Sequence, residues 1–349
     1  MSAPAVDATL PDTEAGRASS GRRALGLVVF LALLAVAVLV SFMFGSNPLP
    51  LGEVWRVLWD RDNSEASSIV WTLRMPRTVI GIVAGAAFAV AGALIQALTR
   101  NPLADSGLLG VNAGAIFAVT LGVAVFGVAS ISGYIWFAFV GAAAATVLVF
   151  FIGAAGGGTA SPVRLILAGV ALGAVLHGIT TFMQLIDPDT FERIRRWGVG
   201  STAATSLEQM RTVLPFLVLG FVLAVAISRQ LDAVALGDDL ASSLGVKVTR
   251  VRIVGLIAMT LLAGGGTALT GGLAFVGLMI PHIVRWFVGP NQRWIFAYSL
   301  IAGPIMVLLA DVIGRVLGRP GEIEAGVMCA VIGAPVLIVL VRRRKASGL

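Results

Sequence analysis

The sequence consists of apolar blocks of about twenty residues separated by short polar segments, and this pattern limits the possible folds more than any other feature. A helix that crosses the hydrocarbon core of a bilayer needs about 20 apolar residues. A transmembrane β-barrel would instead show segments of about ten residues with alternating polarity. The pattern predicts an all-α polytopic membrane protein of about ten transmembrane helices. The blocks cover residues 24–45, 78–98, 108–128, 134–155, 163–185, 211–229, 252–270, 273–289, 295–314 and 325–341.

The composition supports the same class of protein. Hydrophobic residues make up 58% of the chain and charged residues only 12%, whereas soluble domains carry about 25% charged residues. The 42 glycines fit a bundle in which small residues let membrane helices approach closely. The one cysteine, Cys329, lies in an apolar block and is expected to be a small buried side chain.

The distribution of charge predicts how the chain sits in the membrane. Ten helices place both termini on one side, and with that side in the cytoplasm 15 of the 25 basic residues and 7 of the 18 acidic residues lie inside. An excess of Lys and Arg in cytoplasmic loops is the usual orientation signal. We therefore expect both termini in the cytoplasm and the basic run 342–345 on anionic membrane lipid. The net charge of +7 is explained by topology, so no nucleic-acid partner is expected.

The termini are expected to lie outside the helical domain. Residues 1–23 are rich in Ala, Ser, Thr, Pro and Asp, which predicts a disordered cytoplasmic tail. A single transmembrane domain is expected over residues 24–343, followed by a short cytoplasmic tail at 344–349. The block 24–45 is too long for the apolar part of a signal peptide and is interpreted as the first transmembrane helix.

Several missing motifs restrict the function. The sequence has no G-x-x-x-x-G-K-[ST] loop for ATP phosphates, no cluster with metal-ligand spacing and no nucleophile–base motif, so a membrane enzyme is not expected. An ion-coupled secondary transporter remains an alternative, since such proteins use acids or histidines within the membrane. Asp311 is the one acid inside a predicted span, and its spacing from Arg315 predicts an ion pair. His177 is expected to donate to a carbonyl of a neighbouring helix, with a proton relay as the alternative.

Three polar segments are predicted to be helical. Apolar residues in 229–252 recur at helical spacing and predict two short helices outside the membrane, over about 231–246. Their apolar face fits either a groove of a partner protein or this chain's own membrane domain. Residues 50–62 predict an interfacial amphipathic helix with Trp at the headgroup level, and 187–197 predict a short charged helix. Arginines in the outer loops suit a charged protein partner or, alternatively, are simply solvated.

The segment 100–115, RNPLADSGLLGVNAGA, interrupts the apolar pattern with a turn. Pro102 lacks a backbone N–H and disfavours helix at the residue before it, so the second span is predicted to end at Asn101. This turn lies on the cytoplasmic side in the predicted topology.

Five segments resemble the membrane-spanning permease subunits of type II ABC importers, a family that handles iron–siderophores, haem and vitamin B12. They are RMPR at 74–77, GAAFAVAGALIQALTRNPLADSGLLGVNAGA at 85–115, ALGDDLASSLGV at 235–246, GLAFVGLMIPHIVR at 272–285 and DVIGRVLGRPGEIEAGVMCAVIGAPVLIVLVRR at 311–343. The resemblance extends over about 24–343.

The resemblance implies the partners and the site residues. It implies a second permease subunit, identical or related, and a separate ATPase dimer that carries ATP and Mg, so that this chain binds no cofactor itself. It also implies an extracytoplasmic binding protein, and a ferric siderophore, haem or cobalamin as substrate, with siderophore ranked first. The location implied is a prokaryotic cytoplasmic membrane. The matching positions are Arg74, Arg77 and Arg315 for binding-protein docking, Leu236, Gly237, Asp238, Asp239, Leu240, Leu244 and Gly245 for ATPase coupling, and Asn101, Pro102 and Leu103 for an inner gate.

Overall fold

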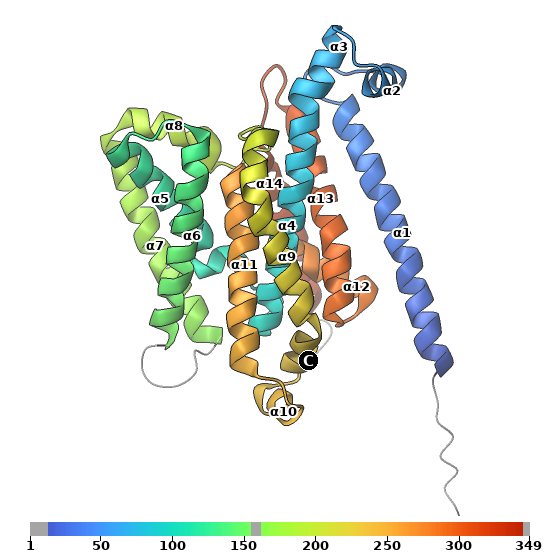
Figure 1. Ribbon diagram of the computed structural model, residues 1–349, viewed down its shortest axis with the longest axis vertical. Helices are drawn as coiled ribbons and strands as arrows, with labels where there is room; N and C mark the ends of the chain where they lie inside the picture. The colour runs from blue at the N-terminus through green and yellow to red at the C-terminus, as the bar shows by residue number, and fades with distance from the viewer. Residues whose placement is uncertain (1–12, 155–161, 345–349) are drawn as a thin grey trace, which may run out of the picture.

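The structure is a computed structural model that describes residues 13–154 and 162–344, and within those ranges it contains helices and connecting loops but no strand. The helices, shown in Figure 1, are α1 (Thr13–Met43), α2 (Leu51–Trp59), α3 (Glu65–Ser68), η1 (Ile69–Arg74), α4 (Met75–Thr99), η2 (Ser106–Leu109), α5 (Val111–Phe126), α6 (Ile131–Ala154), α7 (Pro162–Ile186), α8 (Pro188–Gly198), α9 (Leu207–Ala235), α10 (Asp238–Ser243), α11 (Val248–Thr270), α12 (Val276–Val288), α13 (Gln292–Leu317) and α14 (Ala325–Arg344).

Each predicted apolar block forms a helix, but the blocks are not equally suited to cross a membrane. Among the described residues, seven helices are long and apolar enough to do so. Three others are shorter apolar helices, at Val111–Phe126, Val276–Val288 and Ala325–Val339. The first two correspond to the predicted blocks 108–128 and 273–289, which are interrupted by glycines and, in the second block, also by Pro281. Helix α12 begins at Val276, three residues after the start of the predicted block. Gly271 and Phe275, which precede it, have positive φ angles of 72° and 67° that a helix cannot contain.

The structure differs from the prediction at the start of α1 and in the loop after α9. Helix α1 already begins at Thr13, so residues 13–23 of the expected tail are helical in the structure, while residues 1–12 and 345–349 lie outside the described part of the chain. Ala, Glu and Arg in this stretch favour helix, which lets the apolar helix continue into a polar sequence.

The second difference is in the predicted cytoplasmic loop. Helix α9 continues to Ala235, so the described structure has one short helix, α10, where two were predicted. The reason is burial: Leu231 and Val234 are fully buried against the core and hold the end of α9 in place. The predicted helices at 50–62 and 187–197 are present as α2 and α8.

Helix α4 lies at the centre of the bundle. It packs against α9, α11, α12 and α13, while α5, α6 and α7 form a neighbouring group that α8 covers at one end (Figure 1). The most apolar part of the Glu65–Thr99 segment is 83% buried, whereas that of α1 is only 17% buried. Helix α1 therefore lies at the edge of the bundle, with most of its apolar surface turned outward.

Small residues set the close packing around α4. A Cβ on Gly92 would lie 1.8 Å from the carbonyl oxygen of Gly277 in α12, and one on Gly85 would lie 2.7 Å from Gly303 in α13. No larger residue fits either crossing without moving a backbone, which is how small residues act at interfaces between membrane helices. The glycines of this block thus fix the central helix against two neighbours.

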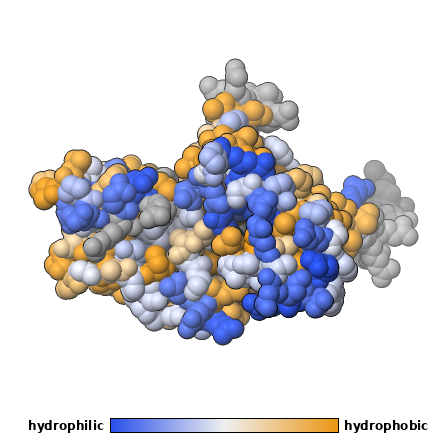
Figure 2. Space-filling view, turned by 90° about the horizontal axis from the view of Figure 1, so that it is seen from above, coloured by the Kyte–Doolittle hydropathy of each residue, from blue (hydrophilic) through white to orange (hydrophobic). Residues whose placement is uncertain are grey.

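The bundle has two polar ends. One end carries α2, α3 and α8, and Figure 2 shows hydrophilic residues gathered on it with hydrophobic residues around the rim. The opposite end carries α10, together with the start of α1 and the end of α14 (Figure 1). The described ends of the chain therefore lie at the same end of the molecule.

Candidate functional site

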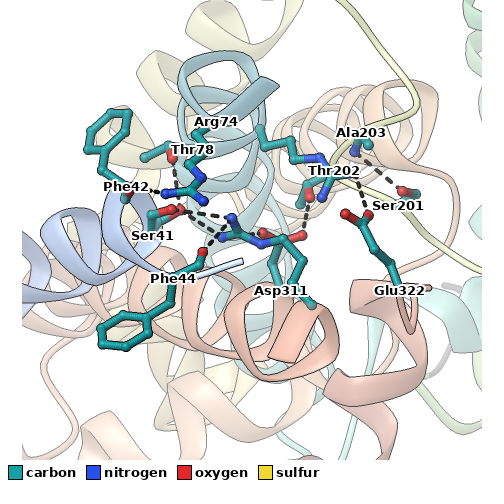
Figure 3. A network of polar contacts seen from close by, with 12 residues as sticks. Ser41, Phe42, Phe44, Arg74, Thr78, Ser201, Thr202, Ala203, Asp311 and Glu322 are labelled. Atoms are coloured by element: carbon teal, nitrogen blue, oxygen red, sulfur yellow. Dashed lines mark hydrogen bonds and ion pairs between the residues drawn. The ribbon is translucent and has the colours of Figure 1, made fainter. Parts of the chain in front are cut away.

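At the end that carries α2 and α3, two of the predicted docking arginines are buried. Arg74 and Arg315 are only 4% and 3% exposed. Arg74 donates hydrogen bonds to the backbone carbonyl of Phe42, in the last turn of α1 (Figure 3), and to that of Asn47, in the loop after α1. Arg315 donates to the carbonyl of Phe44 at 2.9 Å and to that of Ser41 at 3.3 Å. Both guanidinium groups are therefore bound to this chain's own backbone.

A carboxylate completes this network. Asp311 lies 2.9 Å from Arg315, one turn along α13, which confirms the ion pair that their spacing predicts. Asp311 also accepts a hydrogen bond of 2.6 Å from the hydroxyl of Thr202, in the loop between α8 and α9. The hydroxyls of Ser41 and Thr78 lie 2.8 Å apart and link α1 to α4 (Figure 3). The network joins α1, α4, α13 and the loop before α9.

Arg77 has a different environment. Its guanidinium lies 2.5 Å from a carboxylate oxygen of Glu322, in the loop between α13 and α14, and the two side chains are 18% and 37% exposed. A pocket of about 260 Å³ is lined by Arg74, Arg77, Arg315 and Glu322. The structure thus brings the three predicted arginines together, and Arg77 is the one whose ion pair is open to a competing acid. Glu322 has no spacing relation to Arg77 in the sequence, so sequence reasoning missed it.

At the opposite end, α10 presents an apolar surface. Leu236, Leu240 and Leu244 are 64%, 48% and 62% exposed, and they follow one another at intervals of four residues. Gly237 and Gly245 bracket the helix with φ angles of 119° and 81°, which favour glycine. The three leucines form what we call the α10 surface, which the described part of the chain leaves exposed.

The charged residues of α10 are not equivalent. The carboxylate of Asp238 lies 2.9 Å from Arg252 in α11 and also pairs with Arg100, the residue that ends α4. Asp239 is exposed, and no ion pair involves it among the described residues. Asp238 therefore attaches α10 to the ends of two long helices. Sequence reasoning placed Asp238 in the coupling segment but did not identify Arg100 or Arg252 as its partners.

The predicted gate residues form a compact turn directly after Arg100. Helix α4 ends at Thr99, two residues before the predicted end, because Arg100 takes a left-handed conformation with φ 51°. The side-chain oxygen of Asn101 accepts a hydrogen bond of 3.0 Å from the backbone N–H of Leu103, and Pro102 lies between them. Leu103 is 37% exposed. The turn is thus held by its own side chain and leaves an apolar residue accessible.

The loop continues into η2 through Asp105. Its side chain accepts a hydrogen bond of 2.7 Å from the backbone N–H of Gly107, which caps this short helix. Burial raises the pKa of the Asp105 carboxyl, and the hydrogen bond from Gly107 lowers it. The Asp105 side chain thus closes the turn that leads from the gate residues into η2.

The sequence did not predict a buried polar contact of Gln96 next to the gate turn. Gln96, in the last turn of α4, donates a hydrogen bond of 2.9 Å to the carbonyl of Leu278 in α12. Its side-chain oxygen accepts a hydrogen bond from Arg285, also in α12. Gln96 thereby joins the end of α4 to α12, and its polar side chain in an apolar block was the signal that would have found it.

The histidine singled out by the sequence lies apart from these groups. His177 is exposed on α7, and it makes no hydrogen bond with any residue that the structure describes. The predicted bond to a carbonyl of a neighbouring helix is not found among the described residues, where His177 is exposed.

A comparison with protein families decides what kind of protein this is. The model described as the FecCD transport family matches residues 33–343, which is most of the chain. The chain belongs to the FecCD transport family. This confirms the resemblance found in the motifs and, with the apolar helices, makes the chain a multi-pass membrane protein.

Relatives in the FecCD family are similar over nearly their whole length. The chain is 47% identical over 327 residues to the ferric enterobactin transport system permease FepD of Escherichia coli, covering 93% of this chain and 97% of that protein. It is 34% identical to the Fe(3+)-citrate import system permease YfmD of Bacillus subtilis, covering 93% and 96%. A solved metal-chelate type ABC transporter in an inward-facing conformation matches with a TM-score of 0.78 at 27% identity, covering 90% of this chain and 98% of that one.

Proposed function

We propose that this chain is the membrane-spanning permease subunit of an ATP-driven importer that carries a ferric siderophore across the cytoplasmic membrane of a prokaryote. The relatives are named as permeases for ferric enterobactin and Fe(3+)-citrate, which supports an iron chelate as the substrate. Among such chelates, siderophore is favoured over haem and cobalamin because the 47% identity is to the enterobactin permease.

The α10 surface is the observation that carries the proposal. Three exposed leucines, Leu240 on α10 and Leu236 and Leu244 beside its two ends, form a small apolar patch at a polar end of the molecule, and such a patch fits a groove on a partner. We assign this partner as a separate dimeric ATPase that holds ATP and Mg. ATP binding and hydrolysis in this partner then move α10, and this chain performs no covalent chemistry.

The topology follows from the same assignment. The end that carries α10 lies in the cytoplasm together with both termini, and all ten apolar helices cross or enter the membrane. The three shorter helices α5, α12 and the apolar part of α14 do so within the bundle. The pocket of Arg74, Arg77 and Arg315 then faces outward, where an acidic residue of a binding protein competes with Glu322 for Arg77.

The ion pairs of Asp238 suggest how movement of the ATPase reaches the transport pathway. Asp238 joins α10 to Arg100, and Arg100 directly precedes the gate turn of Asn101, Pro102 and Leu103. A displacement of α10 therefore pulls on the end of α4 and on this turn. A second permease subunit, identical or related, supplies the opposite side of the gate, and the two access states are biased by ATP and by substrate.

Co-purification with the cognate ATPase tests the proposal. Leu240→Asp places a charge in the middle of the α10 surface, and we expect it to weaken ATPase binding by at least about tenfold. Ser242→Asp is the matched control, since it adds the same charge to an exposed residue on the other side of α10. If Leu240→Asp and Ser242→Asp both retain the ATPase as well as the wild type does, α10 is not the docking element.

A further inference from the structure

An apolar groove lies between α6 and α11, on the side of the bundle away from α4. It has a volume of about 420 Å³, and ten side chains line it, five from each helix. The lining includes Val147 and Phe150 of α6 and Ile253, Ile257 and Leu261 of α11. Figure 1 shows the two helices side by side, with the ends that hold these residues directed toward α10.

The polar atoms of the groove are already satisfied. The hydroxyl of Thr146 donates to the carbonyl of Ala142 at 2.9 Å, and that of Thr260 donates to the carbonyl of Leu256 at 2.8 Å. Both hydroxyls are bonded within their own helices, so the groove offers only hydrocarbon to a ligand. A chain of methylene groups matches this lining, whereas a polar ligand would lose its hydrogen bonds.

Two basic side chains continue the groove toward the α10 end. Lys247 and Arg250 are exposed, and neither forms an ion pair with an acid in the described part of the chain. Arg250 precedes Ile253 by three residues and Ile257 by seven, so it lies on the same face of α11 as the groove. Lys247 is the residue directly before α11, at the end of the helix where Arg250 lies. The apolar groove therefore ends at a pair of uncompensated positive charges.

The dimensions match one leaflet of a bilayer. From Ile253 to Leu261 the groove extends along α11 for about 12 Å, at 1.5 Å per residue. Half of the hydrocarbon core of a bilayer is about 15 Å thick. A neighbouring transmembrane helix would cross both leaflets. This groove is only as long as one leaflet is thick, and the charges of Lys247 and Arg250 lie where the headgroups of that leaflet would be.

We propose that the groove between α6 and α11 is a binding site for an anionic phospholipid. One acyl chain lies between α6 and α11, and the phosphate of the headgroup lies against Lys247 and Arg250. The site is distinct from the pocket of arginines and from the α10 surface. It depends on the chain being embedded in a membrane and not on the proposed transport function.

Native mass spectrometry of the delipidated full-length protein tests the site, with phosphatidylglycerol or phosphatidylcholine added at equal concentration. Ile257→Trp fills the groove from α11, and Val147→Trp fills it from α6 in case the first variant does not fold. Lys247→Gln/Arg250→Gln removes the charges. Arg229→Gln is the matched control, because this exposed arginine lies on α9 and does not line the groove.

We expect the wild type to retain one more molecule of phosphatidylglycerol than either groove-filling variant. The affinity of the double Gln variant for phosphatidylglycerol at this site should fall about thirtyfold, because the variant lacks two basic residues near the lipid headgroup. The affinity of Arg229→Gln should be unchanged. Equal retention by wild type and the filled variants would overturn the proposal, as would equal binding of the two lipids. A change of oligomeric state on filling, with an unchanged lipid count, would assign the groove to a second copy of the chain.

Discussion

At the scale of single residues, three arginines of one pocket have different roles because they have different partners. Arg74 and Arg315 are buried and bonded to backbone carbonyls at the end of α1 and in the loop that follows it. A buried guanidinium without these bonds would cost several kcal/mol, so both residues hold together the end of the bundle that carries α2 and α3. Arg77 has one partly exposed partner, Glu322, and is the arginine that a docking protein can reach.

Exchanging the charges of Arg77 and Glu322 distinguishes the effect of Arg77 on binding-protein docking from its effect on the stability of this chain. An exposed ion pair contributes at most about 1 kcal/mol, so Arg77→Glu should lower the thermal midpoint only slightly, and Arg77→Glu/Glu322→Arg should restore it. Both variants should bind the cognate binding protein at least about tenfold more weakly, because the outward charge at position 77 is reversed. Thermal unfolding and a binding titration measure the two effects.

Glu322→Gln serves as the control for this experiment, since it removes the internal partner and leaves Arg77 positive. It should bind the binding protein at least as well as the wild type does. Wild-type binding by Arg77→Glu/Glu322→Arg would contradict a docking role for Arg77 and leave it as a structural residue.

Sequence reasoning at this scale succeeded where the contact is local. The ion pair of Asp311 and Arg315 follows from a spacing of four residues on one helix. The bonds of Arg74 to Phe42 and Asn47 join residues 27 or more positions apart, and no periodicity encodes them. Only the packing of α1 against α4 and α13 brings these groups together.

At the scale of elements, the end of α9 and helix α10 show what periodicity can and cannot decide. Leu231, Val234, Leu236 and Leu240 share one helical pattern in the sequence. The first two are buried in the core, and the last two are exposed. The pattern identified the segment, but the boundary between core and partner surface depends on where neighbouring helices end.

Asp238→Asn tests the connection between α10 and the gate turn. The variant removes the charge that binds Arg100 and Arg252 but leaves the leucines of the α10 surface in place. ATPase binding should therefore be retained, while transport per ATP hydrolysed should fall about tenfold, the size of a typical coupling between sites. Substrate uptake and phosphate release from the reconstituted complex give this ratio.

Asp239→Asn is the control, because it removes a neighbouring exposed carboxylate that forms no ion pair among the described residues. It should couple as the wild type does. If Asp238→Asn also transports with the wild-type ratio, the connection through Arg100 is not the coupling route.

At the scale of the whole molecule, hydropathy alone predicted the class of fold, since ten blocks of apolar sequence became helices. It did not predict which helix is central, because that depends on backbone contacts such as Gly92 against Gly277. The motifs predicted the family, and the match over residues 33–343 confirms it. The candidate sites occupy opposite ends of the bundle, as the proposed docking of a binding protein and an ATPase on opposite sides of the membrane requires.

Uptake of a ferric siderophore into proteoliposomes tests the central claim most directly. The vesicles contain this permease with its cognate ATPase, and the binding protein is supplied on the side opposite to the ATPase. We predict uptake that requires ATP, ATPase and binding protein together, and that persists when proton and sodium gradients are collapsed. Uptake without ATP that follows an ion gradient would contradict the account and indicate an ion-coupled transporter.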